Sequence, residues 1–427
     1  MNKIKIITAL TLMFPTYGFA SETSGTVIDT ENLDFPKIIG LAIKNSDAIK
    51  MSEKQVEKSF IDVKMKQSEF LPTVTLQGNA GKTKIDKKTI TSNSVDLSVN
   101  QNLFNGLKTA NGINLAKTAK EKSILNHKKN VSNFILQIGK VYYTVKKIRV
   151  LKQSYEVAMK NSQKIMDIEN IKFKNGASTK TKYLQAESSF YSNKAKLVDM
   201  ETSLNSAKIN FKNITGVDIP KVLPSIDLSG IELPSDMDSL IQKAKKDNMD
   251  VKIAGLDKKI ADYNYKISLA SHSPELNAIG SVKRDITNSM NTVYMGVNYK
   301  VPIFSGGRDI GGVAKSKADK MNSSYAYNQA LQMAEINAMN AWKKYLSSQQ
   351  ELKSYKKSFE SRKLILDAQN IKYKNGLTTS SDLLDAQDKK IQMEQMYISA
   401  QEKHALSILE LLIVINELTP ENLKKIK

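Results

Sequence analysis

The sequence predicts a mixed α and β fold that is mainly α-helical and is built twice from one unit. Three observations carry this prediction. Residues 170–176 (NIKFKNG) return 200 residues later as residues 370–376 (NIKYKNG). Long proline-free stretches have apolar residues at helical spacing, and two shorter segments alternate apolar and polar residues with the period of a β-strand. A period of 200 residues is too long for a solenoid, whose units run about 20 to 50 residues. The repeat therefore indicates two equivalent halves of one body.

The first twenty residues have the features of a secretory signal peptide. Lys3 and Lys5 precede an apolar run from Ile6 to Phe14, and a small-residue segment ends at Ala20. This order predicts a signal peptide over 1–20 and export of the rest; the alternative is a short buried N-terminal helix. No later segment has the roughly 20 consecutive apolar residues that a membrane-spanning helix needs.

Composition excludes some classes of protein. The chain has no cysteine, which rules out disulfides and the lipid-modified cysteine of a lipoprotein. It carries 64 Lys and Arg against 43 Asp and Glu, a net charge of +21. In an exported chain this is poor evidence for a nucleic-acid partner, and we expect none. Two interpretations stay open: lysines coat long solvated helices, or they attract anionic lipid or an acidic partner.

The first repeat is expected over residues 21–216. A short amphipathic helix between Gln55 and Phe70 is stopped by Pro72. Beyond the proline the period changes to two, so residues from about 73–104 should form a β-hairpin with one apolar and one polar face.

Long helical hairpins follow each β-hairpin, over about 108–215 and about 308–417. Their first helices contain no proline, and at 1.5 Å per residue each would reach roughly 90 to 100 Å. An Asn-Gly pair suits the end of a helix because glycine tolerates a positive φ. The chain should therefore reverse at these pairs: Asn175, Gly176, Asn375 and Gly376.

The second repeat is expected over 235–427, after a proline-containing linker at 217–234. It should begin with another short helix and continue as a β-hairpin over about 275–304. The first strand of that hairpin, with Leu276, Ile279 and Val282, alternates poorly.

The predicted strands are about 10 residues long, which is the length of a tilted membrane β-strand. A water-soluble edge hairpin is the alternative. Four strands per chain cannot close into a barrel, whereas three chains would supply twelve. Glycines at the strand-to-helix junctions, Gly106, Gly306 and Gly307, would permit the bends.

In the order and spacing of these parts, the sequence resembles the TolC family of outer membrane channels over nearly the whole mature chain. The resemblance implies a homotrimer whose twelve-stranded barrel in outer membrane lipid continues into a periplasmic α-helical tunnel. It also implies a mixed equatorial region, here formed by residues 217–245 and the C-terminus. The expected function is a passive exit duct of a tripartite efflux pump or type I secretion system. Its partners would be a periplasmic adaptor (membrane fusion) protein and an inner-membrane transporter of ABC, RND or MFS type.

Asp382 and Asp385 are the sharpest site candidates. They are three residues apart just after the second Asn-Gly pair, so they share a helical face. One interpretation is that acids simply favour the start of a helix. The resemblance instead implies a pair of aspartates that rings the closed inner end of the tunnel, six carboxylates in a trimer.

Three further residues are expected at this gate. The resemblance places Tyr373 where a tyrosine latches the closed tip through an interhelical hydrogen bond. Thr378 and Lys182 stand where the best-known member of the family has an arginine and an aspartate, so that member's latch pair is absent. Lys182 could pair instead with Asp382 or Asp385.

An enzyme is not expected. The three histidines, His127, His272 and His404, lack metal-ligand spacing, which predicts surface or packing roles and no metal site. The glycine-rich segment 306–312 matches neither a P-loop nor a dinucleotide motif, so no cofactor is expected. The alternative function is an exported coiled-coil structural or adhesive surface protein, which would lack strands of period two.

Overall fold

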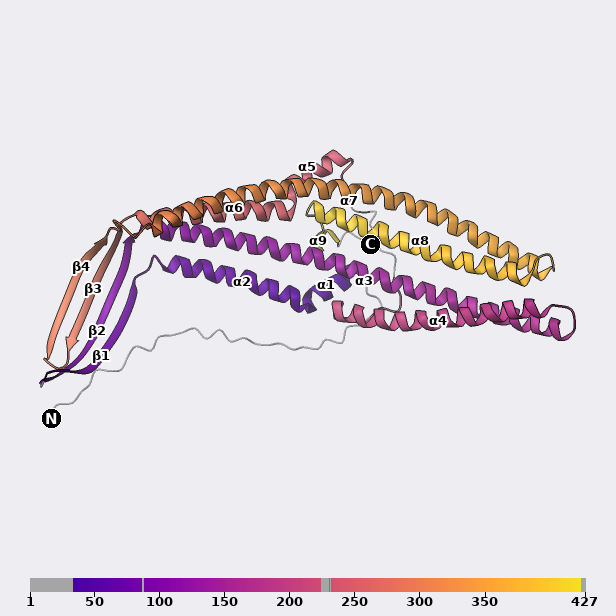
Figure 1. The fold of residues 1–427 in the computed structure, drawn as a ribbon, viewed down its shortest axis with the longest axis horizontal. Helices are drawn as coiled ribbons and strands as arrows, with labels where there is room; N and C mark the ends of the chain where they lie inside the picture. The colour runs from indigo at the N-terminus through magenta and orange to yellow at the C-terminus, as the bar shows by residue number, and fades with distance from the viewer. Residues whose placement is uncertain (1–33, 87, 224–229, 231, 424–427) are drawn as a thin grey trace.

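The computed structural model shows a long protein with a β-sheet at one end and the turns of two helical hairpins at the other (Figure 1). It describes residues 34–86, 88–223, 230 and 232–423, so the predicted signal peptide at 1–20 lies outside the described residues. Within this part of the chain, no helix is both long and apolar enough to cross a membrane.

The first repeat contains six elements. They are α1 (Phe35–Asn45), α2 (Asp47–Ser68), β1 (Thr73–Ile85), β2 (Lys88–Phe104), α3 (Lys108–Lys174) and α4 (Lys180–Thr215). The second repeat has the same order with a 3₁₀ turn and a terminal helix added. Its elements are α5 (Met237–Asp247), α6 (Met249–Leu269), η1 (Ala270–His272), β3 (Glu275–Asp285), β4 (Met290–Lys300), α7 (Arg308–Lys374), α8 (Ser380–Val414) and α9 (Pro420–Leu423).

The four strands form one antiparallel sheet in the order β1-β2-β3-β4, in which β2 and β3 join the two repeats. The register of the sheet pairs apolar residues of neighbouring strands, so that rows of apolar side chains run across all four strands. One such row, whose members are all exposed, is Leu76, Leu97, Val282 and Val293. The sheet therefore has a continuous apolar face that no other described part of the chain covers. An exported coiled-coil structural or adhesive protein, the alternative function, would lack these strands.

Two details of the second β-hairpin differ from expectation. Ile279 pairs with Asn100 and Gly296, so it lies on the face opposite Leu276 and Val282. This is why the sequence of β3 alternates poorly. The hairpin was expected to reach residue 304, but β4 ends at Lys300, just before the segment containing Pro302, which cannot donate to a ladder.

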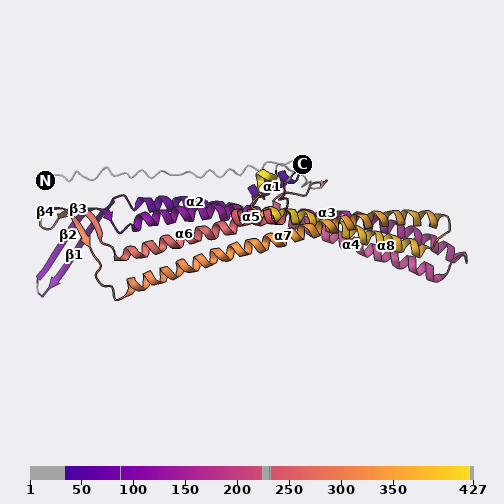
Figure 2. The ribbon, with the colours of Figure 1, turned by 90° about the horizontal axis from the view of Figure 1, so that it is seen from above.

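The helical part is a single curved layer, in which α2, α3, α6 and α7 lie side by side in that order (Figure 2). Helices α3 and α7 have 67 residues each and so reach about 100 Å. The helix expected between Gln55 and Phe70 is longer, because α2 begins at Asp47 with Ser46 as its cap.

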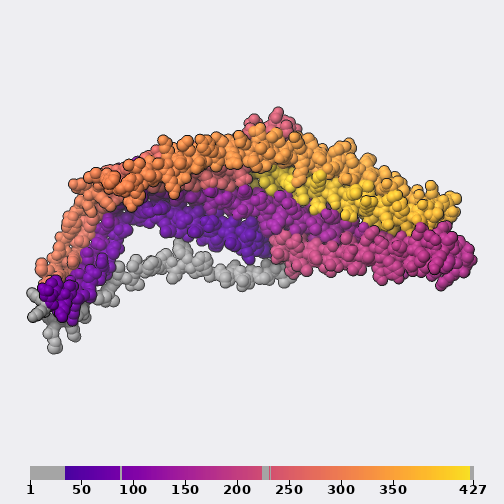
Figure 3. Space-filling model, in the orientation of Figure 1, coloured from indigo at the N-terminus to yellow at the C-terminus, as the bar shows by residue number. Residues whose placement is uncertain are grey.

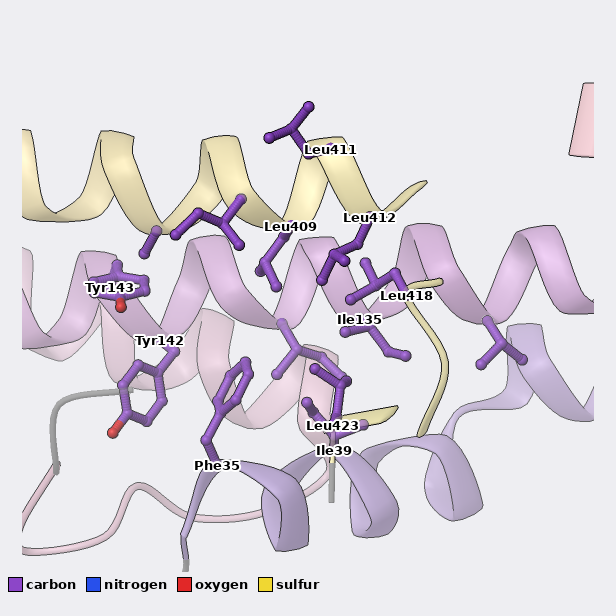
Figure 4. Close-up of a cluster of buried hydrophobic side chains, with 14 of the residues drawn as sticks. Phe35, Ile39, Ile135, Tyr142, Tyr143, Leu409, Leu411, Leu412, Leu418 and Leu423 are labelled. Carbon is purple, nitrogen blue, oxygen red and sulfur yellow. The ribbon is translucent and has the colours of Figure 1, made fainter. Parts of the chain in front are cut away.

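A hydrophobic core lies near the middle of the molecule, where α1 and the end of α8 pack on α3 (Figure 4). Phe35 stacks edge-on against Tyr142 with ring centroids 5.3 Å apart. Val217, Leu240 and Leu418 join this cluster, so the region after α4 and the segment after α8 pack at mid-length. The short helix α1 also belongs to it and was not expected.

The strand-to-helix junctions differ between the repeats. Gly306 and Gly307 both have positive φ values, 65° and 81°, before α7. The first repeat has the same backbone at Gly106 (64°) and at Leu107 (65°), an exposed residue that is not glycine. The second position of this bend therefore tolerates a side chain, at some conformational cost.

Candidate functional site

The two helical hairpins turn with the same backbone geometry. After α3, the amide of Gly176 donates to the carbonyl of Phe173 (3.0 Å), and after α7 the amide of Gly376 donates to the carbonyl of Tyr373 (3.1 Å). Both glycines have positive φ, 70° and 72°. The preceding residues, Asn175 and Asn375, are the C-caps of α3 and α7. Both turns lie at the same end of the molecule (Figure 1), and this end is called the tip.

Asp382 forms a capping box with Thr379, the N-cap of helix α8. Its backbone N–H donates to the hydroxyl of Thr379 (3.2 Å), while its carboxylate accepts from the Thr379 backbone N–H (3.2 Å) and from the Thr379 hydroxyl (2.7 Å). The hydroxyl of Thr378 adds a third bond to that carboxylate (3.1 Å). These bonds, with the Thr379 hydroxyl the largest cause, hold the pKa of Asp382 below its usual value. The exposed carboxylate is therefore charged at neutral pH.

Asp385 lies one turn further along α8 and is also exposed. It forms an ion pair with Lys389 on the same helix (2.7 Å). Lys182, at the start of α4, forms no ion pair with either aspartate among the residues that the structure describes. The structure thus brings Thr378 and Asp382 together but leaves the expected Lys182 pair unmade within one chain.

Tyr373 lies in a small apolar cluster that joins the two hairpins at the tip. The cluster consists of Ile165, Ala186, Leu383 and Leu384, with Met166, Leu366 and Tyr373 packed against it. Among the described residues the buried tyrosine hydroxyl has no hydrogen-bond partner of good geometry, although the Glu169 carboxylate lies near it. The latch bond implied by the resemblance stays a prediction. Burial, and secondly the Glu169 carboxylate, raises the pKa of Tyr373.

Glu169 is a tip residue that the sequence alone did not single out. Its carboxylate is only 3% exposed and accepts a hydrogen bond from Ser178 across the first turn (2.7 Å). Lys172 approaches the same carboxylate at 3.8 Å and its ammonium lies 5.7 Å from the centre of the Tyr373 ring. The available signal was a glutamate near the C-terminus of a helix, where negative charge is unfavourable.

The histidines do not come together. His127 shares a hydrogen bond with Ser52 (2.7 Å). His404 stacks on the Tyr345 ring with centroids 5.6 Å apart, and burial lowers its pKa. Among the described residues, no group of three His, Asp or Glu side chains is placed to hold a metal ion.

Comparison with known proteins gives one consistent result. A model of the family described as outer membrane efflux protein matches residues 38–217 and 240–413. The chain is 22% identical to outer membrane protein TolC of Vibrio cholerae over 95% of both chains. It is 21% identical to outer membrane efflux protein BepC of Brucella suis, over 94% of this chain and 90% of that protein. The open-state structure of the MtrE outer membrane channel of Neisseria gonorrhoeae superposes with a TM-score of 0.77 at 18% identity, covering 95% of this chain and 96% of that one.

Proposed function

Because this chain belongs to the outer membrane efflux protein family, we propose that it is the outer membrane part of a three-part export assembly and that its tip forms the gate. The protein is an efflux or secretion duct in the outer membrane of a Gram-negative cell, with its tunnel in the periplasm. Its fold is that of the trimeric channels of this family, in which three four-stranded sheets make a twelve-stranded barrel.

One observation carries the proposal: the sheet with the uncovered apolar face continues directly into helices of 67 residues. Backbone polar groups in a bilayer must all be paired, so an open four-stranded sheet needs further strands. Trimerisation supplies them and at the same time arranges six helical hairpins around one axis. The hairpin tips are then the narrow end of a tunnel roughly 100 Å from the barrel.

The proposed constriction consists of Asp382 and Asp385. Three chains place six carboxylates around the aperture, which would attract cations. The hydrogen bonds to Asp382 support a charged ring, because they favour the carboxylate over the carboxylic acid. Thr378 holds this carboxylate, while Tyr373 anchors the second hairpin against the first. Lys182 is proposed to face an aspartate of a neighbouring chain.

The energy for export is proposed to come from an inner-membrane transporter of ABC, RND or MFS type. A periplasmic adaptor protein would connect that transporter to the tip. This division of labour suits a chain whose sequence has no nucleotide-binding motif.

Cell fractionation and planar-bilayer recording test the duct. The mature protein should be recovered from the outer membrane as a trimer that dissociates on heating, and the purified trimer should form channels. A monomeric species in the soluble periplasmic fraction that forms no channels would contradict the proposal.

A further inference from the structure

Lysines surround the turn of the first hairpin. Lys172, Lys174, Lys180 and Lys182 are all exposed. Lys172 approaches Glu169, but the other three make no ion pair within the described residues. No aspartate or glutamate occurs between residues 170 and 184. The first turn therefore presents four positive charges and no negative charge at its end.

Two of these lysines oppose the stability of their own helix. Lys180 and Lys182 are in the first turn of α4, which contains no acidic residue. Positive charge is unfavourable at a helix N-terminus, where the helix dipole is positive. The equivalent turn of α8 has the expected acid, Asp382. Local helix stability accounts for Lys172 and Lys174, which lie in the last turn of α3. It does not account for Lys180 and Lys182, whereas an anion from outside the chain would.

The turn of the second hairpin adds to the same charge. Lys372 and Lys374 are exposed and make no ion pair in the described part of the chain. The one acid between residues 370 and 384 is Asp382, whose carboxylate already accepts three hydrogen bonds. Both turns lie together at the end of the molecule opposite the sheet (Figure 3).

Apolar side chains lie among these lysines. Ile171 and Ile371 are 61% and 62% exposed, and Leu377, directly after the second turn, is 74% exposed. An apolar centre inside a polar, solvent-accessible rim is the usual arrangement of a protein interface. An anionic lipid surface would use the lysines but gives no reason for apolar side chains on narrow, separate helical ends.

We propose that the tip is a docking face for a periplasmic protein whose own contact surface is acidic. This face consists of Lys174, Lys180, Lys372 and Lys374 with Leu377 at its apolar centre. The inference rests on the proposed function and specifies the chemistry of the adaptor. Each chain contributes two basic ends, so a trimer presents six.

The test uses the purified trimer in nanodiscs and a designed helical hairpin displayed on a hexameric scaffold. The hairpin has glutamates around its turn, and otherwise identical hairpins carry glutamine or lysine there. At about 50 mM NaCl the Glu hairpin should bind about tenfold tighter than the Gln hairpin, and this preference should shrink at about 300 mM because salt screens the charges.

Charge reversal supplies the decisive comparison. The variant K174E/K180E/K374E should lose the preference for the Glu hairpin and should gain binding of the Lys hairpin. The matched control K194E/K208E/K353E changes the charge equally at exposed lysines away from the turns and should bind like the wild type.

Two results would overturn the docking face. One is equal affinity for the Glu and Gln hairpins at low salt. The other is binding to vesicles of about 30% phosphatidylglycerol that matches binding to the Glu hairpin, which would make the face a lipid contact. Planar-bilayer conductance of the same preparations separates the two proposals: loss of channels contradicts the duct, whereas intact channels without charge preference contradict only the acidic partner.

Discussion

The carboxylate of Asp382 accepts a 2.7 Å hydrogen bond from the hydroxyl of Thr379, so the residue proposed to line the constriction is also half of a capping box. The same carboxylate accepts from the Thr379 backbone N–H. Fixing it at the first turn of α8 gives the proposed ring a defined position. It also means that replacing Asp382 alters helix α8 as well as the charge at the aperture.

Asp385 gives the cleaner test of the constriction, because its ion pair within the described residues is with the exposed Lys389 on the same helix. Asp385→Ala should raise single-channel conductance and weaken block by multivalent cations, by about tenfold in blocking concentration. Asp382→Ala combined with Asp385→Ala should enlarge both effects. Recording in planar bilayers measures them.

Thr379→Ala is the control, since it removes the N-terminal cap, at about 1 kcal/mol, but keeps both carboxylates. It should retain cation block. If the double aspartate variant has the conductance and block of the wild type, the two residues do not line the aperture.

Ser178 is expected to stabilise the tip through Glu169. Ser178→Ala removes the 2.7 Å bond to a carboxylate that is 3% exposed, and hydrogen bonds to buried charged groups contribute about 1.5–3 kcal/mol. Thermal unfolding of the detergent-solubilised trimer should shift to lower temperature. Glu169→Gln should cost less, because its amide oxygen can still accept from Ser178.

A matched control is Ser361→Ala, whose exposed hydroxyl donates to the carbonyl of Lys357 within the same helix. It should leave the melting temperature nearly unchanged. Equal shifts for the two serine variants would show that the Glu169 contact contributes nothing beyond a surface hydroxyl.

His404 should make the middle of the molecule sensitive to acid. Burial lowers its pKa from the ordinary value of 6.5. As the pH falls below about 6.5, the unfolded chain binds a proton here that the folded chain resists. Stability should therefore be complete above that pH and decline down to the lowered folded pKa.

Melting temperatures between about pH 7.5 and 5.5 measure this slope. His404→Gln should flatten it. An identical pH slope in wild type and His404→Gln would contradict the assignment.

The elements that follow from short-range patterns are predictable from sequence. Proline at 72 and the Asn-Gly pairs mark where β1 begins and where α3 and α7 end, and the alternation after Pro72 predicts the face of β1. The face of Ile279 was not predictable, because it depends on pairing with Asn100, 179 positions away in the chain. An apolar residue there occupies a polar face that only the sheet register identifies.

The residues of the candidate site were likewise predictable only in part. Spacing alone puts Asp382 and Asp385 on one face of a helix start, but it cannot show that Thr378 and Thr379 hold the first of them. Glu169 was missed because its buried carboxylate lies near Tyr373 of the second hairpin, a neighbour that is distant in the sequence. The residues next to Glu169 in the sequence indicate only a glutamate on a helix.

Gly106 and Gly306 offer a comparison within one chain. Both have φ near 65°, so alanine at either position should incur a backbone cost of about 1 kcal/mol. A Cβ at Gly306 would meet nothing within 4 Å, whereas one at Gly106 would overlap Ser273 and lie 3.3 Å from Ala270 Cα. Gly106→Ala should therefore destabilise the junction of β2 and α3 by about 1–3 kcal/mol more than Gly306→Ala destabilises its counterpart. Adding Ser273→Gly to Gly106→Ala should recover most of that difference in thermal unfolding of the trimer. Equal destabilisation by the two alanines, or no recovery in the double variant, would mean that the close approach of η1 to the first bend does not constrain the junction.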